Sequence, residues 1–359
     1  MSETLPSWPL FGLVDDIRPA LVRAAASKLP LALATIVDLD GGGPRPVGDQ
    51  MSVTEDEVCG FLSGGCLEAD VVTHARELLA DSGPSRRLVY GQGSPWADIR
   101  LLCGARIEIL LERIAPDDPA LATLLQLTSA RQPALWLTDG ERRACGPANA
   151  PPQEWQGAFA RPYDPQTRLI VMGGDPTALA IAALGVQNGF ETTLVRPKGP
   201  VEPPPIPGVA YSRDDPAAAF PAIGLDPWTA VAVASHEAAL DHEGLVAALP
   251  SEAFYVGALG ARRRLEDRRS SLAAAGIAER DIDRMRAPIG LDIGGKAPFE
   301  IAVAVLAEIT ALRHAPSLAQ AMRSSGSTST TSPAAAAGAP AGRRSRASAS
   351  ANTATSEES

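Results

Sequence analysis

The stretch from Gly41 to Glu68 contains the residues whose types and spacing are best suited to chemistry. It reads Gly-Gly-Gly-Pro-Arg-Pro-Val-Gly over 41–48 and Ser-Gly-Gly-Cys over 63–66, with a β-rich run between the two segments. Glycine lets the backbone adopt positive φ and approach a ligand closely, and a side chain at the same position costs free energy. The pattern predicts two ligand-facing turns that bracket one hairpin, and it makes Gly48, Gly64 and Gly65 candidate binding residues.

Cys66 follows the second glycine turn and precedes a helical pattern. That pattern is an apolar stripe at helical spacing, made of Leu67, Val71, Ala75, Leu78 and Leu79. The spacing places Cys66 in the first turn of a helix, where free N–H groups and the positive end of the helix dipole stabilise anions and favour a thiolate. We therefore expect Cys66 to be a reactive thiol or a metal ligand.

Two other side chains are candidates for the same site. Arg45 lies between Pro44 and Pro46, on a stiff loop that suits an anionic ligand. The alternative interpretation is that Arg45 is an ordinary surface charge without a ligand. Cys103 precedes Gly104 in a turn and could approach Cys66, although the sequence alone does not bring them together. Of the remaining thiols, Cys59 is expected to be a packed residue of the hairpin. Cys145 is expected to have no functional role.

The strand, turn and helix over 169–187 occupy the place of a dinucleotide-binding fingerprint. The turn reads Gly173-Gly174-Asp175, so an acid stands where the second glycine of Gly-x-Gly-x-x-Gly belongs, and the next strand ends in Arg196 instead of an acid. These residues predict a Rossmann-shaped domain without tight NAD binding. The alternative is an NADP-type or other phosphate ligand held by Arg196 with the Gly173 turn.

Two later positions also fall where open α/β sheets bind ligands. His236 follows a predicted strand in Ala-Ser-His-Glu, and both catalysis by His236 and helix capping by Ser235 fit this place. Asp292 lies in the glycine-rich segment Gly290–Lys296 before the last helix, whose N–H groups or Lys296 could hold phosphate. A plain helix entry explains this segment equally simply, and we prefer it.

Composition narrows the class of protein. The chain has 359 residues, enough for two cores, and a net charge of −10, which argues against nucleic acid as the main partner. Four cysteines without a CxxC pair disfavour a disulfide scaffold and a zinc site. No apolar run approaches the ~18 residues of a membrane-spanning helix, and the first nine residues do not resemble a signal peptide, so we expect a cytoplasmic protein.

Hydrophobic periodicity divides the chain into successive parts. Residues 10–114 are expected to form an α+β domain from a helix, a strand at 31–37, the hairpin 51–62, the Cys66 helix and two further strands. Residues 115–166 are predicted to be an appendage and a proline-rich linker. Residues 167–316 alternate strand and helix, which predicts an α/β, doubly wound parallel sheet, and residues 325–359 have the composition of a disordered tail.

Taken together, these motifs resemble the XdhC/CoxI family of xanthine dehydrogenase accessory proteins. The resembling segments run in order along residues 31–314: Gly43-Pro-Arg-Pro-Val-Gly-Asp-Gln-Met51, Ser63-Gly-Gly-Cys-Leu-Glu68, Cys103-Gly-Ala-Arg-Ile-Glu108, Tyr255-Val-Gly-Ala-Leu-Gly-Ala-Arg-Arg263 and Ala287-Pro-Ile-Gly-Leu-Asp-Ile-Gly294. The resemblance implies an N-terminal XdhC/CoxI domain and a C-terminal Rossmann-like domain. This sequence departs from the family pattern at Asp175, in the Rossmann turn, and at Arg196. These two departures put binding of a nicotinamide cofactor in doubt.

The resemblance also implies a function. Members bind molybdenum cofactor (molybdopterin), support its sulfuration and insert it into an apo molybdenum hydroxylase of the xanthine dehydrogenase type. A cysteine desulfurase as a further partner and a homodimer are compatible with this role. The rival interpretations are an NAD(P)-linked oxidoreductase or a nucleotidyltransferase that acts on the same cofactor, and a module that only bridges partners.

Overall fold

The computed structural model describes residues 5–315 except 7, 44, 64, 66, 93, 95–103 and 105. Its first sheet is antiparallel throughout, with the strand order β3-β2-β1-β5-β4. The strands are β1 (Leu31–Asp40), β2 (Gln50–Val53), β3 (Val58–Gly60), β4 (Arg86–Gly91) and β5 (Arg106–Ile114). The strands predicted at 31–37 and in the hairpin 51–62 are therefore confirmed.

Strand β1 lies at the centre of this sheet, and its side chains pack against helices on both faces of the sheet. Because side chains alternate across a strand, Ala32, Ala34 and Ile36 pack with α2 (Glu68–Asp81) on one face. Leu31 and Leu33 pack on the other face, with α1 (Arg18–Ala26) and α3 (Pro119–Ser129). A short 3-10 helix, η1 (Leu10–Leu13), precedes α1. The N-terminal half is thus a sheet covered by helices on both faces.

A second, three-stranded antiparallel sheet has the order β7-β6-β8, with β6 (Ala134–Thr138), β7 (Arg143–Pro147) and β8 (Phe159–Tyr163). Within the predicted proline-rich linker the structure has the strand β8, which pairs with β6 along its whole length. Pro162 is tolerated there because β8 is an edge strand, where a missing N–H donor leaves no ladder bond broken. Trp136 and Tyr163 share a core with α1 and α3, so this sheet completes the same hydrophobic core.

The C-terminal half contains a parallel sheet of six strands in the order β11-β10-β9-β12-β13-β14. The strands are β9 (Arg168–Met172), β10 (Glu191–Val195), β11 (Ala210–Ser212), β12 (Thr229–Val233), β13 (Tyr255–Ala258) and β14 (Met285–Arg286). The helices are α4 (Pro176–Gln187), α5 (Pro216–Ile223), α6 (Ala238–Ala248), α7 (Leu265–Ala274), α8 (Glu279–Ile282) and α9 (Pro298–Arg313), with a 3-10 turn η2 (Arg262–Arg264). The predicted doubly wound sheet is confirmed.

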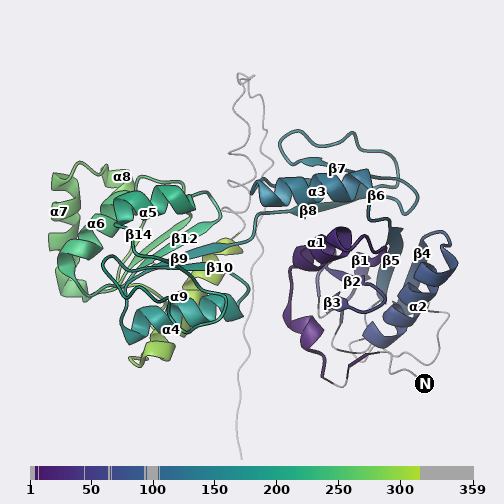
Figure 1. Ribbon diagram of the computed structural model, residues 1–359, viewed down its shortest axis with the longest axis horizontal. Coiled ribbons are helices and arrows are strands. Elements are labelled where there is room, and N and C mark those ends of the chain that lie inside the picture. The colour runs from purple at the N-terminus through teal and green to yellow at the C-terminus, as the bar shows by residue number, and fades with distance from the viewer. Residues whose placement is uncertain are drawn as a thin grey trace, which may run out of the picture. The chain divides into compact units, whose positions relative to one another are not determined.

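Helices cover both faces of the parallel sheet, as Figure 1 shows. Leu169 and Val171 of β9 face the layer of α4 and α9, and Ile170 and Met172 face the layer of α5 and α6. Strand order reverses between β9 and β12, and in such sheets the carboxyl ends of the two strands at the reversal form the ligand crevice. The fold therefore directs attention to the segments that follow β9 and β12.

Gly60 and Gly48 offer a test of backbone strain in the N-terminal sheet. Both have positive φ, +95° and +97°, but a Cβ on Gly60 would lie 2.4 Å from the carbonyl oxygen of Gln50, and a Cβ on Gly48 would meet nothing within 4 Å. We expect Gly60→Ala to lower the free energy of unfolding by about 3 kcal/mol, from strain and overpacking together. Gly48→Ala should lower it by only about 1 kcal/mol, from strain alone. Urea denaturation measures both values, and equal losses would contradict the packing account.

Candidate functional site

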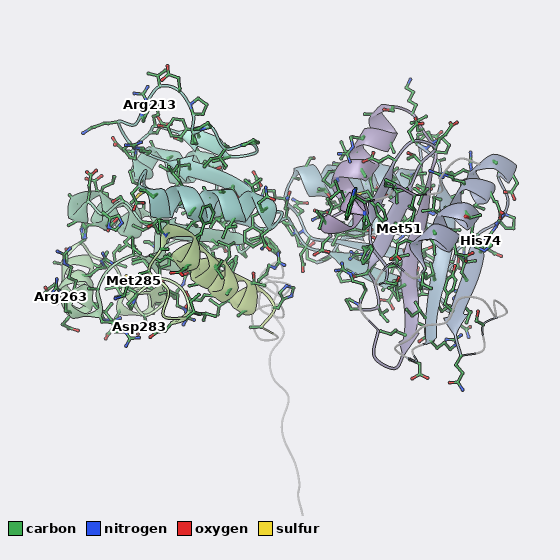
Figure 2. All side chains as sticks on the ribbon, turned by 90° about the horizontal axis from the view of Figure 1, so that it is seen from below. Met51, His74, Arg213, Arg263, Asp283 and Met285 are labelled. Carbon is green, nitrogen blue, oxygen red and sulfur yellow. The ribbon has the colours of Figure 1, made fainter. Side chains whose placement is uncertain are left out.

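The two glycine segments lie at the same end of the β2–β3 hairpin. Met51 at the start of β2 pairs with Gly60 at the end of β3, so the segment that enters β2 and the segment that leaves β3 emerge side by side. Figure 2 labels Met51, which is fully buried in the core of this half. The register therefore brings together the two turns that the sequence predicts to bracket one hairpin.

The second glycine segment is fixed by the buried carboxylate of Glu68, which has no solvent-exposed surface. Its Oε1 accepts hydrogen bonds from the backbone N–H groups of Leu62 and Ser63, at 3.1 and 2.7 Å. Its Oε2 accepts from the Ser63 hydroxyl at 2.8 Å and from the N–H of Leu67 at 3.2 Å. One carboxylate thus holds the backbone on both sides of residues 64–66.

Three of the predicted site residues, Gly64, Cys66 and Cys103, lie outside the described residues. Of their neighbours, Gly65 has a φ of +96° with open space where a Cβ would be, which suits a turn that a ligand approaches. Helix α2 begins at Glu68 with Leu67 as its N-cap, later than the helix start predicted around Cys66.

Arg45 in the first glycine segment is already engaged by two carboxylates. It donates a hydrogen bond from Nη2 to Oδ1 of Asp15 at 2.7 Å, and its Nε lies 2.5 Å from Oδ2 of Asp49 without hydrogen-bond geometry, so we treat that contact as a charge pair. Burial raises the pKa of Asp49 in spite of this cation. The N–H of Gly48 donates to the carbonyl of Ile36 at 2.8 Å. The first segment is therefore held in place by Arg45, whose charge is matched locally.

The carboxyl end of β9 leads into a turn shaped like that of a Rossmann fold, but its residues differ from the dinucleotide-binding fingerprint. Gly173 has a φ of +150°, and a Cβ there would lie 2.3 Å from the carbonyl oxygen of Ala234, so this glycine allows close contact between the segments after β9 and β12. A Cβ on Gly174 would collide with the Arg196 side chain, which places that guanidinium against the turn. The structure thus brings the predicted residues Gly173 and Arg196 together.

Asp175 and His236 meet across the reversal point. The Asp175 carboxylate caps α4 by accepting from the N–H of Ala178 at 2.9 Å, and its second oxygen lies 2.8 Å from Nε2 of His236. His236 has a positive φ of 61°. The predicted alternative of helix capping by Ser235 is not the arrangement found, because Glu237 is the N-cap of α6 and the Ser235 hydroxyl donates to Asp241 at 2.6 Å. His236 therefore lies in the candidate crevice, bound to an acid.

The glycine-rich segment before α9 behaves as a helix entry. Glu300 accepts from the N–H groups of Lys296 and Ala297, at 2.8 and 3.0 Å, so two of the donors that could have held phosphate are used within the chain. Asp292 lies 3.2 Å from Arg262, and both side chains are exposed. These contacts support the interpretation preferred from the sequence, and Asp292 remains a peripheral member of the predicted site.

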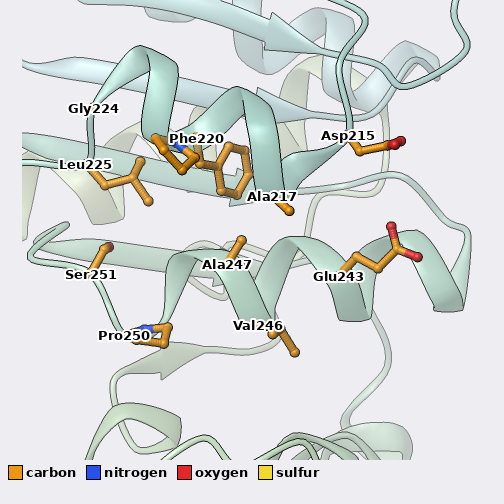
Figure 3. Close-up of a pocket in the computed structure, with 11 residues that line it drawn as sticks. Asp215, Ala217, Phe220, Gly224, Leu225, Glu243, Val246, Ala247, Pro250 and Ser251 are labelled. Atoms are coloured by element: carbon orange, nitrogen blue, oxygen red, sulfur yellow. The ribbon is translucent and has the colours of Figure 1, made fainter.

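Two cavities of the C-terminal half differ in chemistry. The larger, about 790 Å³, is a groove between α5 and α6 lined mainly by apolar side chains such as Phe220, Leu225 and Val246 (Figure 3). A cavity of about 380 Å³ instead has titratable groups in its wall, including His236, His242 and Arg264. Among the described residues, no cluster of three or more His, Cys, Asp or Glu side chains is arranged to hold a metal ion.

Glu68 and Glu77 are both on α2 and provide a matched test of the buried carboxylate. Glu68→Gln keeps the side-chain volume but replaces an acceptor by an NH2 group that opposes the N–H of Leu67, so we expect a loss of about 2 kcal/mol in the free energy of unfolding. Glu77→Gln removes an ion pair with Arg86 at the surface and should cost less than about 1 kcal/mol. Chemical denaturation with a circular dichroism readout compares the two, and a Glu68→Gln protein as stable as Glu77→Gln would refute the role assigned to Glu68.

Asp175 also predicts weak dinucleotide binding. A carboxylate in the turn opposes a pyrophosphate, so calorimetry should detect no NADH binding tighter than about 1 mM, or about −4 kcal/mol. Asp175→Gly recreates Gly-x-Gly-x-x-Ala over 173–178 and should increase affinity, with Arg196 favouring the 2′-phosphate of NADPH. Micromolar NADH binding by the unaltered protein would contradict this account of the turn.

Comparison with known proteins relates this geometry to a family. Residues 24–91 match the XdhC and CoxI family, and residues 169–309 match the XdhC Rossmann domain. The chain is 32% identical over 306 residues to the molybdenum cofactor insertion chaperone PaoD of Escherichia coli (strain K12), covering 84% of this chain and 90% of that protein. It is 26% identical over 322 residues to a probable xanthine dehydrogenase subunit of Bacillus subtilis (strain 168), covering 78% of this chain and 92% of that protein.

A solved structure shares the fold. The crystal structure of a protein described as a xanthine dehydrogenase from Bacillus halodurans matches 82% of this chain and 95% of its own, with a TM-score of 0.68 and 24% sequence identity. None of the helices in the described ranges is both long and apolar enough to cross a membrane. The family matches lie on the sheet that carries the two glycine segments and on the parallel sheet with the Gly173 turn, and we conclude that the chain belongs to the XdhC and CoxI family.

Proposed function

We propose that this protein binds molybdenum cofactor, supports its sulfuration and inserts it into an apo molybdenum hydroxylase of the xanthine dehydrogenase type. The observation that carries the proposal is the 32% identity to a molybdenum cofactor insertion chaperone over 90% of that chaperone's length. Because the match is nearly end to end, it includes both the sheet with the glycine segments and the parallel sheet.

The hairpin end formed by the two glycine segments is the proposed cargo site. An insertion chaperone must hold a large anionic cofactor and then release it, which favours contacts from backbone N–H groups over a deep enclosed cavity. Gly48 and Gly65 have nothing within 4 Å of the position of a Cβ, so a planar ligand could approach each closely, although the N–H of Gly48 is already donated to the carbonyl of Ile36. Glu68 fixes the backbone at Ser63 and at Leu67, on either side of residues 64–66.

Cys66 is the proposed ligand of molybdenum or of its sulfur atoms. A thiolate is a soft donor and suits a metal bound by dithiolene sulfur. Arg45 contributes by holding the first segment in shape, because its own charge is matched by Asp15 and Asp49. Gly173, Arg196 and His236 would offer a second contact region for the cofactor, at the carboxyl edge of the parallel sheet.

Sulfuration requires a sulfur donor, so a cysteine desulfurase is the partner class that the proposal adds to the client hydroxylase. The chain would present the bound cofactor at the exposed hairpin end, where a donor enzyme and then a client can reach it. Copurification of this protein with a desulfurase, dependent on bound cofactor, is the corresponding observation to seek.

Cys66→Ala tests the proposal directly. We expect protein purified from a molybdenum-replete host to yield fluorescent pterin after oxidation, and Cys66→Ala to lower the pterin per folded protein at least several-fold. Cys145→Ala is the matched control, since burial raises the pKa of Cys145 to about 11 and keeps it a neutral thiol. Circular dichroism verifies that each variant is folded.

Transfer provides the second readout. The loaded protein should restore activity to an apo hydroxylase, and Cys66→Ala should restore less of it at equal protein concentration. If Cys66→Ala binds and transfers as much pterin as the unaltered protein, the ligand is held elsewhere. If the unaltered protein carries no pterin and activates no client, the proposed function itself is wrong.

A further inference from the structure

The cavity of about 380 Å³ in the C-terminal half lies beside the carboxyl ends of β12 and β13. It is bounded by the segment after β12, which carries His236, by the segment after β13, which carries Leu259 and Gly260, and by the start of α7. It therefore opens on the edge of the sheet where parallel folds bind ligands, but on the β13 side of the reversal point and not at the Gly173 turn.

One wall of this cavity is fixed by a buried charge pair. The carboxylate of Asp241 is 5% exposed as a residue, accepts from the backbone and hydroxyl of Ser235 at 3.1 and 2.6 Å, and lies 3.5 Å from the guanidinium of Arg268. Arg268 also donates from both terminal nitrogens to the carbonyl of Leu259 at 3.2 Å. The charges of Asp241 and Arg268 neutralise one another, and their hydrogen bonds fix the segments that follow β12 and β13.

Arg264 lines the same cavity with its charge unmatched. The residue is exposed, and within the described part of the chain its guanidinium makes no hydrogen bond or ion pair, whereas the neighbouring Arg262 is paired with Asp292. The only other acid in the lining besides Asp241 is Asp267, which is exposed on the first turn of α7. A guanidinium that has no protein partner at the rim of a concave site suits an anion that can accept two parallel hydrogen bonds.

Further donors converge on this space. His242 and Ser271 face one another, with Nδ1 and the hydroxyl 3.2 Å apart, and both line the cavity. Ala238, the first residue of α6, also lines it, and α6 has no side-chain cap at its N-terminus. In the Ser271–His242 pair one group donates to the other, so the pair leaves one donor for a ligand. That donor, the uncapped backbone N–H groups and the Arg264 guanidinium together suit phosphate oxygens.

We propose that this cavity binds a phosphate ester, with Arg264 as the charged ligand of the phosphate. Its volume accommodates a phosphoryl group with part of the molecule attached to it, in the range of small-molecule sites. Two sources fit this chemistry: the phosphorylated tail of the pterin cargo, which rests on the function proposed above, and a free nucleotide bound independently of it.

Arg263 supplies a matched control for Arg264. It is the adjacent residue in the same 3-10 turn, is exposed, and is not part of the cavity lining. Figure 2 shows Arg263 at the surface of the C-terminal half. Replacing either arginine by alanine removes the same charge from the same short segment, so a difference between the two variants reports on the cavity.

The experiment titrates cofactor-free full-length protein with AMP, with inorganic phosphate and with adenosine, using calorimetry. We expect AMP and phosphate to bind and adenosine not to bind. Arg264→Ala should weaken AMP binding at least tenfold, and Arg263→Ala should change it less than twofold. The absence of AMP and phosphate binding up to 10 mM, or equal losses in the two variants, would overturn the proposal; this concentration limit corresponds to affinities weaker than about −3 kcal/mol.

A second arm identifies the source of the phosphate. Pterin occupancy is measured in the same variants after purification from the molybdenum-replete host. Reduced occupancy in Arg264→Ala but not in Arg263→Ala supports the cargo as the source, and unchanged occupancy together with lost AMP binding supports a nucleotide. Because the titrations use protein without cofactor, failure of the proposed chaperone function leaves their result interpretable.

Discussion

The Glu68 carboxylate is the interaction on which the candidate cargo site depends. A buried charge is costly unless hydrogen bonds replace its hydration, and here four donors from Leu62, Ser63 and Leu67 surround it. Three of those donors are backbone groups on either side of residues 64–66, so the same contacts that stabilise the charge also fix the two ends of the loop. A loop whose ends are fixed loses less conformational entropy when it binds a ligand.

Strand register is the second constraint, and it acts together with the first. The pairing of Met51 with Gly60 places the segment before β2 next to the segment after β3. A shift of one residue would turn the apolar side chains of Met51 and Val53 away from the core that they share with α2, so this core specifies the register. Arg45 then anchors the first segment to Asp15, which precedes α1. The geometry of the site is thus determined by core packing that lies outside it.

Much of the fold could be predicted from the sequence, because the strands of the C-terminal half are apolar runs separated by helical patterns. The strand β8 was missed because Pro162 argues against a strand, and only the edge position of β8 makes that proline acceptable. The site was predicted less completely. The sequence shows a helix with Glu68 near its start, but the hydrogen bonds that the side chain makes to the preceding loop depend on a three-dimensional turn that periodicity does not encode.

The altered Rossmann turn shows how a fold can persist when a ligand contact is replaced. Asp175 takes the position of a glycine that would admit a pyrophosphate, but its carboxylate caps α4 and pairs with His236, so the helix start remains satisfied. The replacement therefore leaves the helix start satisfied, while it puts a carboxylate where a dinucleotide would present its pyrophosphate. On the β13 side of the same carboxyl edge, Arg264 lines a cavity, and its guanidinium has no hydrogen bond or ion pair among the described residues.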